Sequence, residues 1–165
     1  MAATEWLRST KGASASLEAL DAIECRDALM VKRADGNDEE ALWPEAEFIV
    51  GNPPFLGGKW MLESLGEEYT LRLRKIFGER IPSTTDLVTY WFDRARVAIS
   101  QSRSKSTGLV ATNMIRGLGN RPIVERITDD CQIFDAWSDK PWIVDGADVR
   151  VSIVVSESVK SARSN

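Results

Sequence analysis

Four consecutive residues, Asn52-Pro53-Pro54-Phe55, combine the groups needed to hold a nitrogen heterocycle. The Asn52 side chain carries a carbonyl acceptor and an amide donor, and the Pro53 carbonyl is a second acceptor in a direction that the prolines fix. Phe55 adds a flat apolar ring. Such a set suits a planar heterocycle with an exocyclic amino group, because the acceptors take the amino protons while the ring stacks. The alternative is a proline-stiffened loop with Phe55 in the core.

The residues before this tetrapeptide predict the strand that positions it. Phe48-Ile49-Val50 are apolar and two of them are β-branched, which is typical of a buried strand, and Gly51 ends the run. The prolines that follow cannot continue a sheet ladder. We therefore expect a rigid turn at the carboxyl end of a strand, where open α/β sheets bind ligands.

The remaining elements are predicted from apolar periodicity and turn residues. A helix is expected from Leu87, opened by a capping-box-like pair, Ser83 and Asp86, with aromatic residues that pack in the core. A polar acidic loop is expected over residues 32–46. Short helices are expected over Trp60–Leu65, Glu67–Phe77 and from Pro122 to near Asp130, and strands over Ile23–Leu29, Gly108–Thr112, Ile133–Trp137 and Val149–Val155.

The tetrapeptide resembles the catalytic pattern of the amino-group DNA methyltransferases, the N6-adenine type especially. The stretch Ile49–Lys59 resembles the large adenine methyltransferases of restriction-modification and phage-defence systems. The resemblance covers roughly Ile23 to Glu157. It is also carried by Asp86–Phe92, Gly108–Asn113, Trp137–Asp139 and Asp145–Val151.

The resemblance implies an α/β fold, a partial Rossmann-like S-adenosylmethionine methyltransferase sheet with flanking helices that lacks its first strands. Residues 23–157 are expected to form the partial catalytic domain, residues 1–22 are unassigned, and residues 158–165 are expected to be a disordered tail. The family's glycine-rich cofactor loop is not found in residues 1–22, nor is its target-recognition domain found after Glu157. The central strand would then have an unpaired apolar edge.

The resemblance also assigns roles to single residues. Asn52, Pro53, Pro54 and Phe55 match the catalytic positions, and Asp27 matches the acid that binds the adenine amino group of S-adenosylmethionine. A strand-end aspartate that caps a turn is the alternative for Asp27. The expected substrate-binding residues are Lys59, Asn113, Arg116 and Arg121, with Trp142 as a second stacking ring.

The function implied is site-specific N6-methylation of a flipped adenine in double-stranded DNA, within a complete enzyme. As a fragment, the chain is expected to bind S-adenosylmethionine weakly or not at all, and a partner chain would supply the missing cofactor segment. Two alternatives stay open. One is a non-catalytic remnant that binds DNA or a partner, and the other is an α/β interaction module without a site.

Composition bounds these readings. The chain has 165 residues, the length of one domain, and 43% hydrophobic residues are enough for a core. There is no histidine, which excludes histidine triads and histidine metal sites, and no metal is implied. Cys25 and Cys131 form no metal spacing, and no apolar run is long enough to span a membrane. We expect a reduced, cytoplasmic protein without a membrane partner.

The charge is unevenly distributed. A net charge of −4 is wrong for a self-sufficient DNA binder. Residues 35–47 hold six acids and no base, whereas residues 94–126 hold seven bases and one acid. A phosphate-facing surface is one interpretation of the basic stretch, and a solvated helix face is the other.

Overall fold

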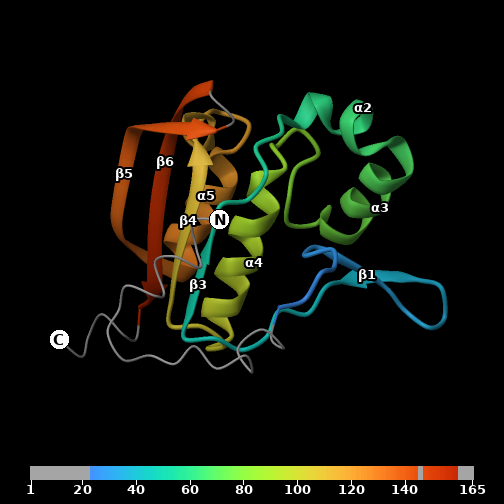
Figure 1. Ribbon diagram of the computed structural model, residues 1–165. Coiled ribbons are helices and arrows are strands. Elements are labelled where there is room, and N and C mark those ends of the chain that lie inside the picture. Colours follow the sequence, from blue (N-terminus) through green and yellow to red (C-terminus); the bar gives the residue numbers. More distant parts are fainter. Residues whose placement is uncertain (1–22, 145–146, 160–165) are drawn as a thin grey trace.

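Strand β3 (Phe48–Gly51) belongs to a four-stranded sheet in the computed structural model, which describes residues 23–144 and 147–159. The strand order is β3-β4-β6-β5, in which β4 is Ser106–Thr112, β5 is Cys131–Val144 and β6 is Ala147–Ser158. β3 runs parallel to β4, and β6 runs antiparallel to both β4 and β5. Figure 1 shows this sheet flanked by helices, so the fold is mixed α/β with a mixed sheet.

The position of β3 corrects one expectation. Phe48 and Val50 are 64% and 83% exposed, so β3 is not the buried strand that its apolar residues predicted. The physical reason is that β3 is the edge strand of the described sheet, where these two side chains share the face that α4 and α5 leave uncovered. Its other edge meets no strand among residues 23–144 and 147–159.

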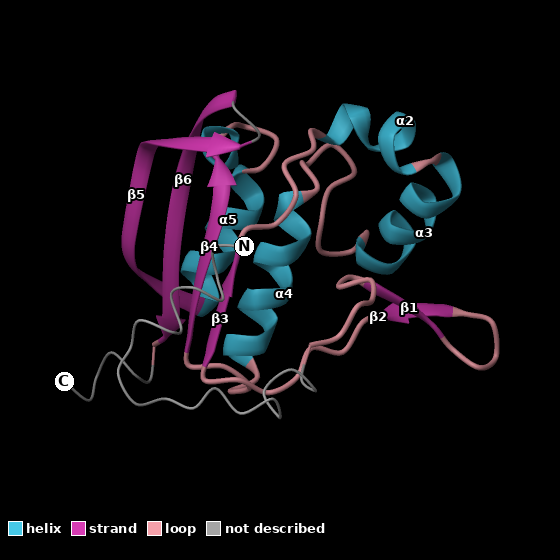
Figure 2. Ribbon diagram, viewed as in Figure 1, coloured by secondary structure: helices cyan, strands magenta, loops and turns pink. Residues whose placement is uncertain are grey.

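Two helices, α4 (Val88–Ser100) and α5 (Arg121–Asp130), cover the other face of the sheet (Figure 2). Leu109 and Ala111 of β4 lie in one buried cluster with residues of both helices. Both helices were predicted, but the capping box was wrong. No side chain caps α4, because Asp86 binds other loops instead.

The helices α2 (Met61–Leu65) and α3 (Glu67–Phe77) match the prediction and lie beside α4. Phe77 at the end of α3 packs edge-on against Tyr90 of α4, with ring centroids 5.2 Å apart. Arg72 of α3 binds Asp38, with its Nε 2.7 Å from the carboxylate, and so ties α3 to the N-terminal hairpin.

The strand predicted over Ile23–Leu29 is wrong. Asp27 Oδ1 accepts hydrogen bonds from the backbone N–H groups of Leu29 and Met30, at 2.8 and 3.2 Å. This stretch therefore forms a turn and does not pair with another strand. The chain pairs later. β1 (Met30–Lys32) and β2 (Asp38–Glu40) form an antiparallel hairpin within the stretch predicted as an acidic loop. Gly36, with a φ of 83°, closes its turn.

Strands β5 and β6 are longer than predicted and form the outer hairpin of the sheet. The polar residues Ser138 and Asp139 lie within β5 because a register shift between Trp137 and Lys140 absorbs them. Asp139 adopts a φ of 56° there. Pro141 is compatible with β5 because β5 is an edge strand.

The predicted N-terminal segment 1–22 lies outside the described residues. Of the predicted tail 158–165, Ser158 is the last residue of β6 and only Val159 is described beyond it. Within residues 23–144 and 147–159, no helix is long and apolar enough to cross a lipid bilayer.

Candidate active site

Asn52 follows β3 directly and is exposed, whereas Pro53 behind it is buried. The Asn52 side chain has no hydrogen bond to another residue of the described ranges, so its carbonyl and amide groups are open to a ligand. Gly51 packs against β4, since a Cβ at Gly51 would lie 3.4 Å from the Leu109 side chain. Glycine and the buried proline therefore hold the turn at the carboxyl ends of β3 and β4.

A hollow of about 380 Å³ opens on one side of the turn. We call it the Asn52 hollow. It is lined by Asn52, Pro53 and Pro54 of the turn, together with Gly51, Trp43 and Trp91. Trp91 comes from α4, is half-buried and packs against the core, as predicted for the aromatic residues of this helix, and it also lines this hollow.

The Trp43 wall of this hollow is fixed from several sides. Its indole Nε1 donates to the Ala28 carbonyl at 2.6 Å, and Arg103 donates to the Trp43 carbonyl. The guanidinium carbon of Arg94 lies 5.3 Å from the centre of the Trp43 ring, within cation–π range. The Trp43 side chain is therefore held in place by contacts from outside the turn.

A second hollow, of about 490 Å³, opens beside Phe55. We call it the Phe55 hollow. Lys59 lies at its border, with its Nζ 5.0 Å from the centre of the Trp60 ring. Its lining includes Phe55, Lys59, Trp60, Asp86, Thr112 and Met114. Thr112 and Met114 belong to the end of β4 and to the 3₁₀ helix η3 (Asn113–Arg116), so the carboxyl ends of both parallel strands contribute.

The tetrapeptide lies between these two hollows. Asn52, Pro53 and Pro54 line one, and Phe55 lines the other. The sequence suggested that the acceptors and the ring face one spot, but the structure distributes them over two neighbouring spaces. The turn therefore borders two separate hollows.

Asp27 lies in neither lining and is exposed. Its Oδ1 accepts the Leu29 and Met30 N–H groups, which is the turn-capping role left open above. The pKa of the Tyr69 hydroxyl is raised, first by burial and then by its hydrogen bond to Asp27. Asp27 thus has structural partners, although a carboxylate has further acceptor sites.

Asn113 and Arg116 follow β4, near the Phe55 hollow, but both are engaged. The Asn113 side chain donates to Asp139 and accepts the Ser152 hydroxyl at 2.8 Å. Arg116 forms an exposed ion pair with Asp139 at 3.5 Å. Asn113 therefore ties the β4 loop to β5 and β6, whereas Arg116 remains accessible.

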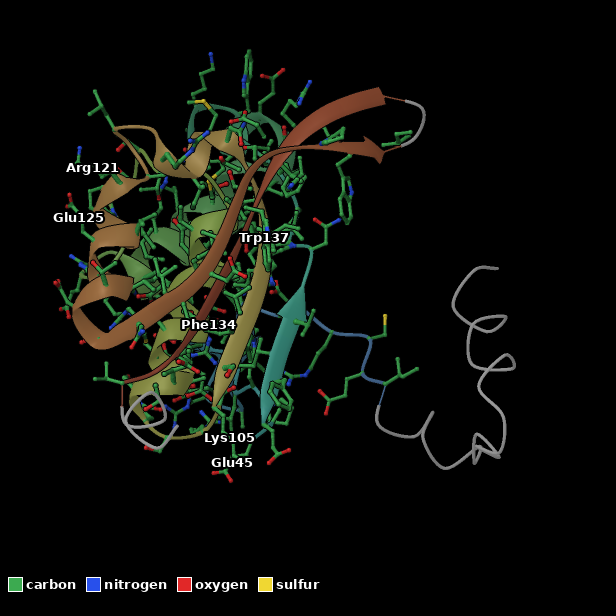
Figure 3. All side chains as sticks on the ribbon, turned by 90° about the vertical axis from the view of Figure 1, so that its left-hand side faces the viewer. Glu45, Lys105, Arg121, Glu125, Phe134 and Trp137 are labelled. Atoms are coloured by element: carbon green, nitrogen blue, oxygen red, sulfur yellow. The ribbon has the colours of Figure 1, made fainter. Side chains whose placement is uncertain are left out.

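Of the other predicted binding residues, only Lys59 lines a hollow. Arg121 opens α5 and pairs with Glu125 on the same helix at 2.8 Å, exposed to solvent (Figure 3). Trp142 is half-buried in β5 opposite Val149 of β6 and lines neither hollow. The structure does not bring Trp142 to Phe55.

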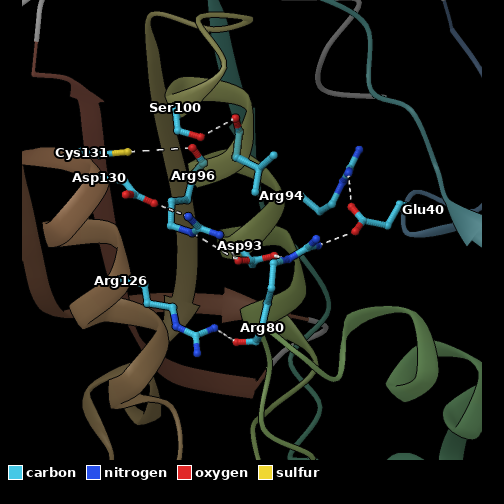
Figure 4. A network of polar contacts seen from close by, with 10 residues as sticks. Glu40, Arg80, Asp93, Arg94, Arg96, Ser100, Arg126, Asp130 and Cys131 are labelled. Carbon is cyan, nitrogen blue, oxygen red and sulfur yellow. Dashed lines mark hydrogen bonds and ion pairs between the residues drawn. The ribbon is translucent and has the colours of Figure 1, made fainter.

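The basic stretch 94–126 is largely used inside the protein (Figure 4). Asp93 is fully buried and binds Arg80 at 2.7 Å and Arg96 at 2.8 Å. Arg94 pairs with Glu40, and Arg96 also binds Asp130. A phosphate-facing surface is therefore wrong for Arg94 and Arg96, because their side chains are largely withdrawn from solvent and pair with Glu40 and with the buried Asp93.

Sequence reasoning missed several residues that line the hollows. The parallel pairing of two predicted strands is the signal that could have found the residues after β4, since carboxyl ends of parallel strands meet at one edge. No comparable signal marked the tryptophans, which come from separate loops and helices. The missed residues are Trp43, Trp60, Asp86, Trp91, Thr112 and Met114.

Comparison with known proteins identifies the family. The model of the MmeI DNA-methyltransferase domain matches residues 4–164. The fold is also similar to the solved structure of the type IIL restriction-modification enzyme MmeI in complex with DNA, with a TM-score of 0.50 and 24% identity over 67% of this chain. The chain covers 15% of that protein's length. No curated protein matches. The protein belongs to the MmeI DNA-methyltransferase domain family of restriction-modification methyltransferases.

Proposed function

We propose that this chain forms the base-binding part of an S-adenosylmethionine-dependent DNA methyltransferase that acts on the N6 amino group of adenine. The observation that carries the proposal is the exposed Asn52 amide, without a hydrogen bond to the described residues, on a strand-end turn between two hollows. Membership of the MmeI family supports DNA methylation. Adenine specificity rests on the Asn52-Pro53-Pro54-Phe55 pattern.

The chemistry follows from the groups on this turn. The adenine amino nitrogen is a poor nucleophile because its lone pair is delocalised into the ring. Hydrogen bonds from this amino group to the Asn52 side-chain carbonyl and the Pro53 carbonyl favour a tetrahedral nitrogen and free the lone pair. The turn is held rigid before the substrate arrives, so it acts by positioning and electrostatic preorganisation.

We assign the two hollows to the two substrates. The base, flipped out of the duplex, would enter the Phe55 hollow and stack on Phe55. The methyl donor would occupy the Asn52 hollow, whose lining includes Trp43 and Trp91. S-adenosylmethionine, when bound, supplies an electrophilic methyl group. Amino nitrogen and methyl would then meet at the turn.

The cofactor contacts within the described residues are few. Asp27 would accept a hydrogen bond from the adenine amino group of the cofactor, but its Oδ1 already binds two backbone N–H groups. No glycine-rich phosphate-type loop precedes β1 within the described ranges. We expect a Kd for S-adenosylmethionine weaker than micromolar, or binding energy of less than about 8 kcal/mol.

Double-stranded DNA is the proposed macromolecular partner, as in the related MmeI complex. Lys59, Arg116 and Arg121 are exposed and would reach phosphates around the Phe55 hollow. Asn113 would contribute mainly by holding the loop after β4, and Trp142, which lines neither hollow, is assigned no contact with the base. We place the protein in the cytoplasm, where its DNA substrate lies.

A non-catalytic, partner-binding role is the second candidate, and the free edge of β3 favours it. Phe48 and Val50 expose apolar surface beside an edge without a described strand, which suits the addition of a strand from another segment. Such a segment would extend the sheet toward a Rossmann-like arrangement. The same surface would serve the enzymatic proposal if the added segment carries the cofactor loop.

The test is methyl transfer from labelled S-adenosylmethionine to DNA, with the chain alone and with a co-expressed polypeptide that carries a glycine-rich cofactor segment. We expect methyl transfer only when the chain and the co-expressed polypeptide are present together. The Asn52→Ala variant should abolish this transfer. Asn37→Ala, an exposed asparagine in the hairpin turn, is the matched control. Full activity of Asn52→Ala would refute the role of Asn52, and micromolar cofactor binding by the chain alone would refute the division of the site.

A further inference from the structure

Three loops far apart in the sequence meet at the Phe55 hollow. They are the segment Leu56–Trp60 after the tetrapeptide, the segment Pro82–Leu87 before α4, and the segment Asn113–Asn120 after β4. Each contributes residues to the lining of the hollow. The shape of the space beside Phe55 therefore depends on what holds these loops together.

Asp86 and Leu87 hold the first loop to the second. The Leu87 N–H donates to the Leu56 carbonyl at 2.8 Å, and the Gly58 N–H donates to Asp86 Oδ1 at 3.0 Å. The contact is close enough to require glycine, because a Cβ at Gly58 would lie 2.7 Å from the Thr84 carbonyl oxygen. The chain one to three residues beyond Phe55 is thus fixed against the loop before α4.

Asn120 holds the second loop to the third. Its Oδ1 accepts the Asp86 N–H at 2.8 Å, and its Nδ2 donates to Asp86 Oδ2 at 2.7 Å and to the Met114 carbonyl at 2.8 Å. Asn120 is 3% exposed and does not line the hollow, so it acts from behind the wall. All the polar atoms of its side chain have partners, which makes its orientation unambiguous.

We infer that the Asp86–Asn120 pair is the positioning element of the base pocket: it sets the distance between the Phe55 loop and the Met114 wall, and thereby the fit of a flat base. This inference rests on the proposed function for the identity of the ligand. The pair touches neither Asn52 nor the Asn52 hollow. It therefore governs the binding of the base and leaves the methyl-donor side unchanged.

The side-chain chemistry of the pair allows a sharp set of variants. Asp86→Asn keeps an acceptor for Gly58 but turns an NH₂ group toward the Asn120 NH₂ group. Asn120→Asp turns a carboxylate toward that of Asp86 and toward the Met114 carbonyl. The double variant, Asp86→Asn with Asn120→Asp, restores a donor–acceptor pair between the two side chains, although Met114 stays without its donor.

Two measurements test the inference. The first is hydrogen exchange of the Gly58 amide, which reports the strength of the hydrogen bond from Gly58 to Asp86 in the absence of any ligand. The second is the affinity for a fluorescently labelled single-stranded oligonucleotide with one adenine, which needs no extrusion from a duplex. Asp35→Asn is the matched control, because the Asp35 carboxylate accepts the Asn37 N–H at 2.9 Å in the exposed hairpin turn.

We expect Gly58 exchange about tenfold faster and oligonucleotide affinity about tenfold weaker in Asp86→Asn and Asn120→Asp, consistent with the loss of a charge-assisted hydrogen bond. The double variant should recover part of both, and Asp35→Asn should change neither. Should Asn120→Asp not fold, Asp86→Asn alone decides. The inference would be overturned if the single variants exchange the Gly58 amide at the wild-type rate. It would also be overturned if the wild type binds the oligonucleotide and the single variants bind it equally well. A wild type that does not bind the oligonucleotide would refute the proposed function. In that case Gly58 exchange still decides whether the Asp86–Asn120 pair holds the loop after Phe55 in place.

Discussion

The Asn52 turn and the arginines of α4 carry polar groups that the sequence marked for binding, but the fold uses them in opposite ways. Asn52 is exposed at a strand end, with its amide free of described partners. Arg94 and Arg96 are close to fully buried, in ion pairs with Glu40 and Asp93. A count of charges therefore says less about binding than the place of each group, because charges that face the core must be neutralised there.

The largest difference between the two regions should appear in stability. Asp93→Ala leaves Arg80 and Arg96 without their buried carboxylate, and we expect a loss of about 3–5 kcal/mol in the free energy of unfolding. Asn52→Ala removes no hydrogen bond to the described residues and should change stability by no more than about 0.5 kcal/mol. Urea unfolding of both variants measures their free energies of unfolding. Equal losses of stability in the two variants would contradict the contrast between the two regions.

The second prediction concerns the ring beside the turn. Phe55→Ala should weaken the binding of a flipped base by about 1–3 kcal/mol, the range for base–aromatic stacking. Phe134→Ala is the control, since Phe134 is a half-exposed aromatic ring on β5 that lines neither hollow (Figure 3). The measurement is a titration with 2-aminopurine DNA. If both variants lose the same affinity, Phe55 has no special place in the site.

The third prediction separates the exposed cations by their position along β4. Arg116 lies just after the carboxyl end of β4, whereas Lys105 lies before its amino end and pairs with Glu47. We expect Arg116→Ala to lower the slope of log affinity for DNA against log salt by about 1, as for one lost phosphate contact. Lys105→Ala should leave the slope unchanged. The reverse order would move the DNA to the other end of the sheet.

The smallest effect concerns the hairpin far from the site. The hydrogen bond from Arg72 lowers the pKa of Asp38 below its ordinary value. Because the folded-state pKa is the lower one, this contact stabilises the protein fully above about pH 5 and is lost as the pH falls through about 4 and below. Asp38→Asn should flatten the acid limb of the stability curve. Base binding at neutral pH should be unchanged in this variant.

Much of the secondary structure follows from local pattern. The helix Glu67–Phe77 is placed with its observed bounds, and the β4 and α5 predictions fall within two residues of theirs. Patterning failed at Ile23–Leu29, because periodicity does not show that Asp27 takes the N–H groups a strand would need. It also failed to show that β3 is an edge strand, since three apolar residues look alike in a central and in an edge strand.

The candidate site divides in the same way. The tetrapeptide and its strand were identified from residue types and spacing alone. The walls contributed by Trp43, Trp91 and Met114 were not, because they arrive from separate elements. Trp142 was placed beside the base by its position in the chain, but the length of β5 carries it to the outer hairpin.

The amino-acid sequence by itself determined the strand–glycine–asparagine–proline turn and its methyltransferase character, because glycine, proline and asparagine act on the backbone within a few residues. Only the tertiary structure decided which cations form ion pairs inside the protein, which face of β3 stays exposed, and how three loops meet beside Phe55. Those outcomes depend on contacts between residues that are dozens of positions apart in the sequence. A local sequence pattern does not show which distant residue a side chain will contact.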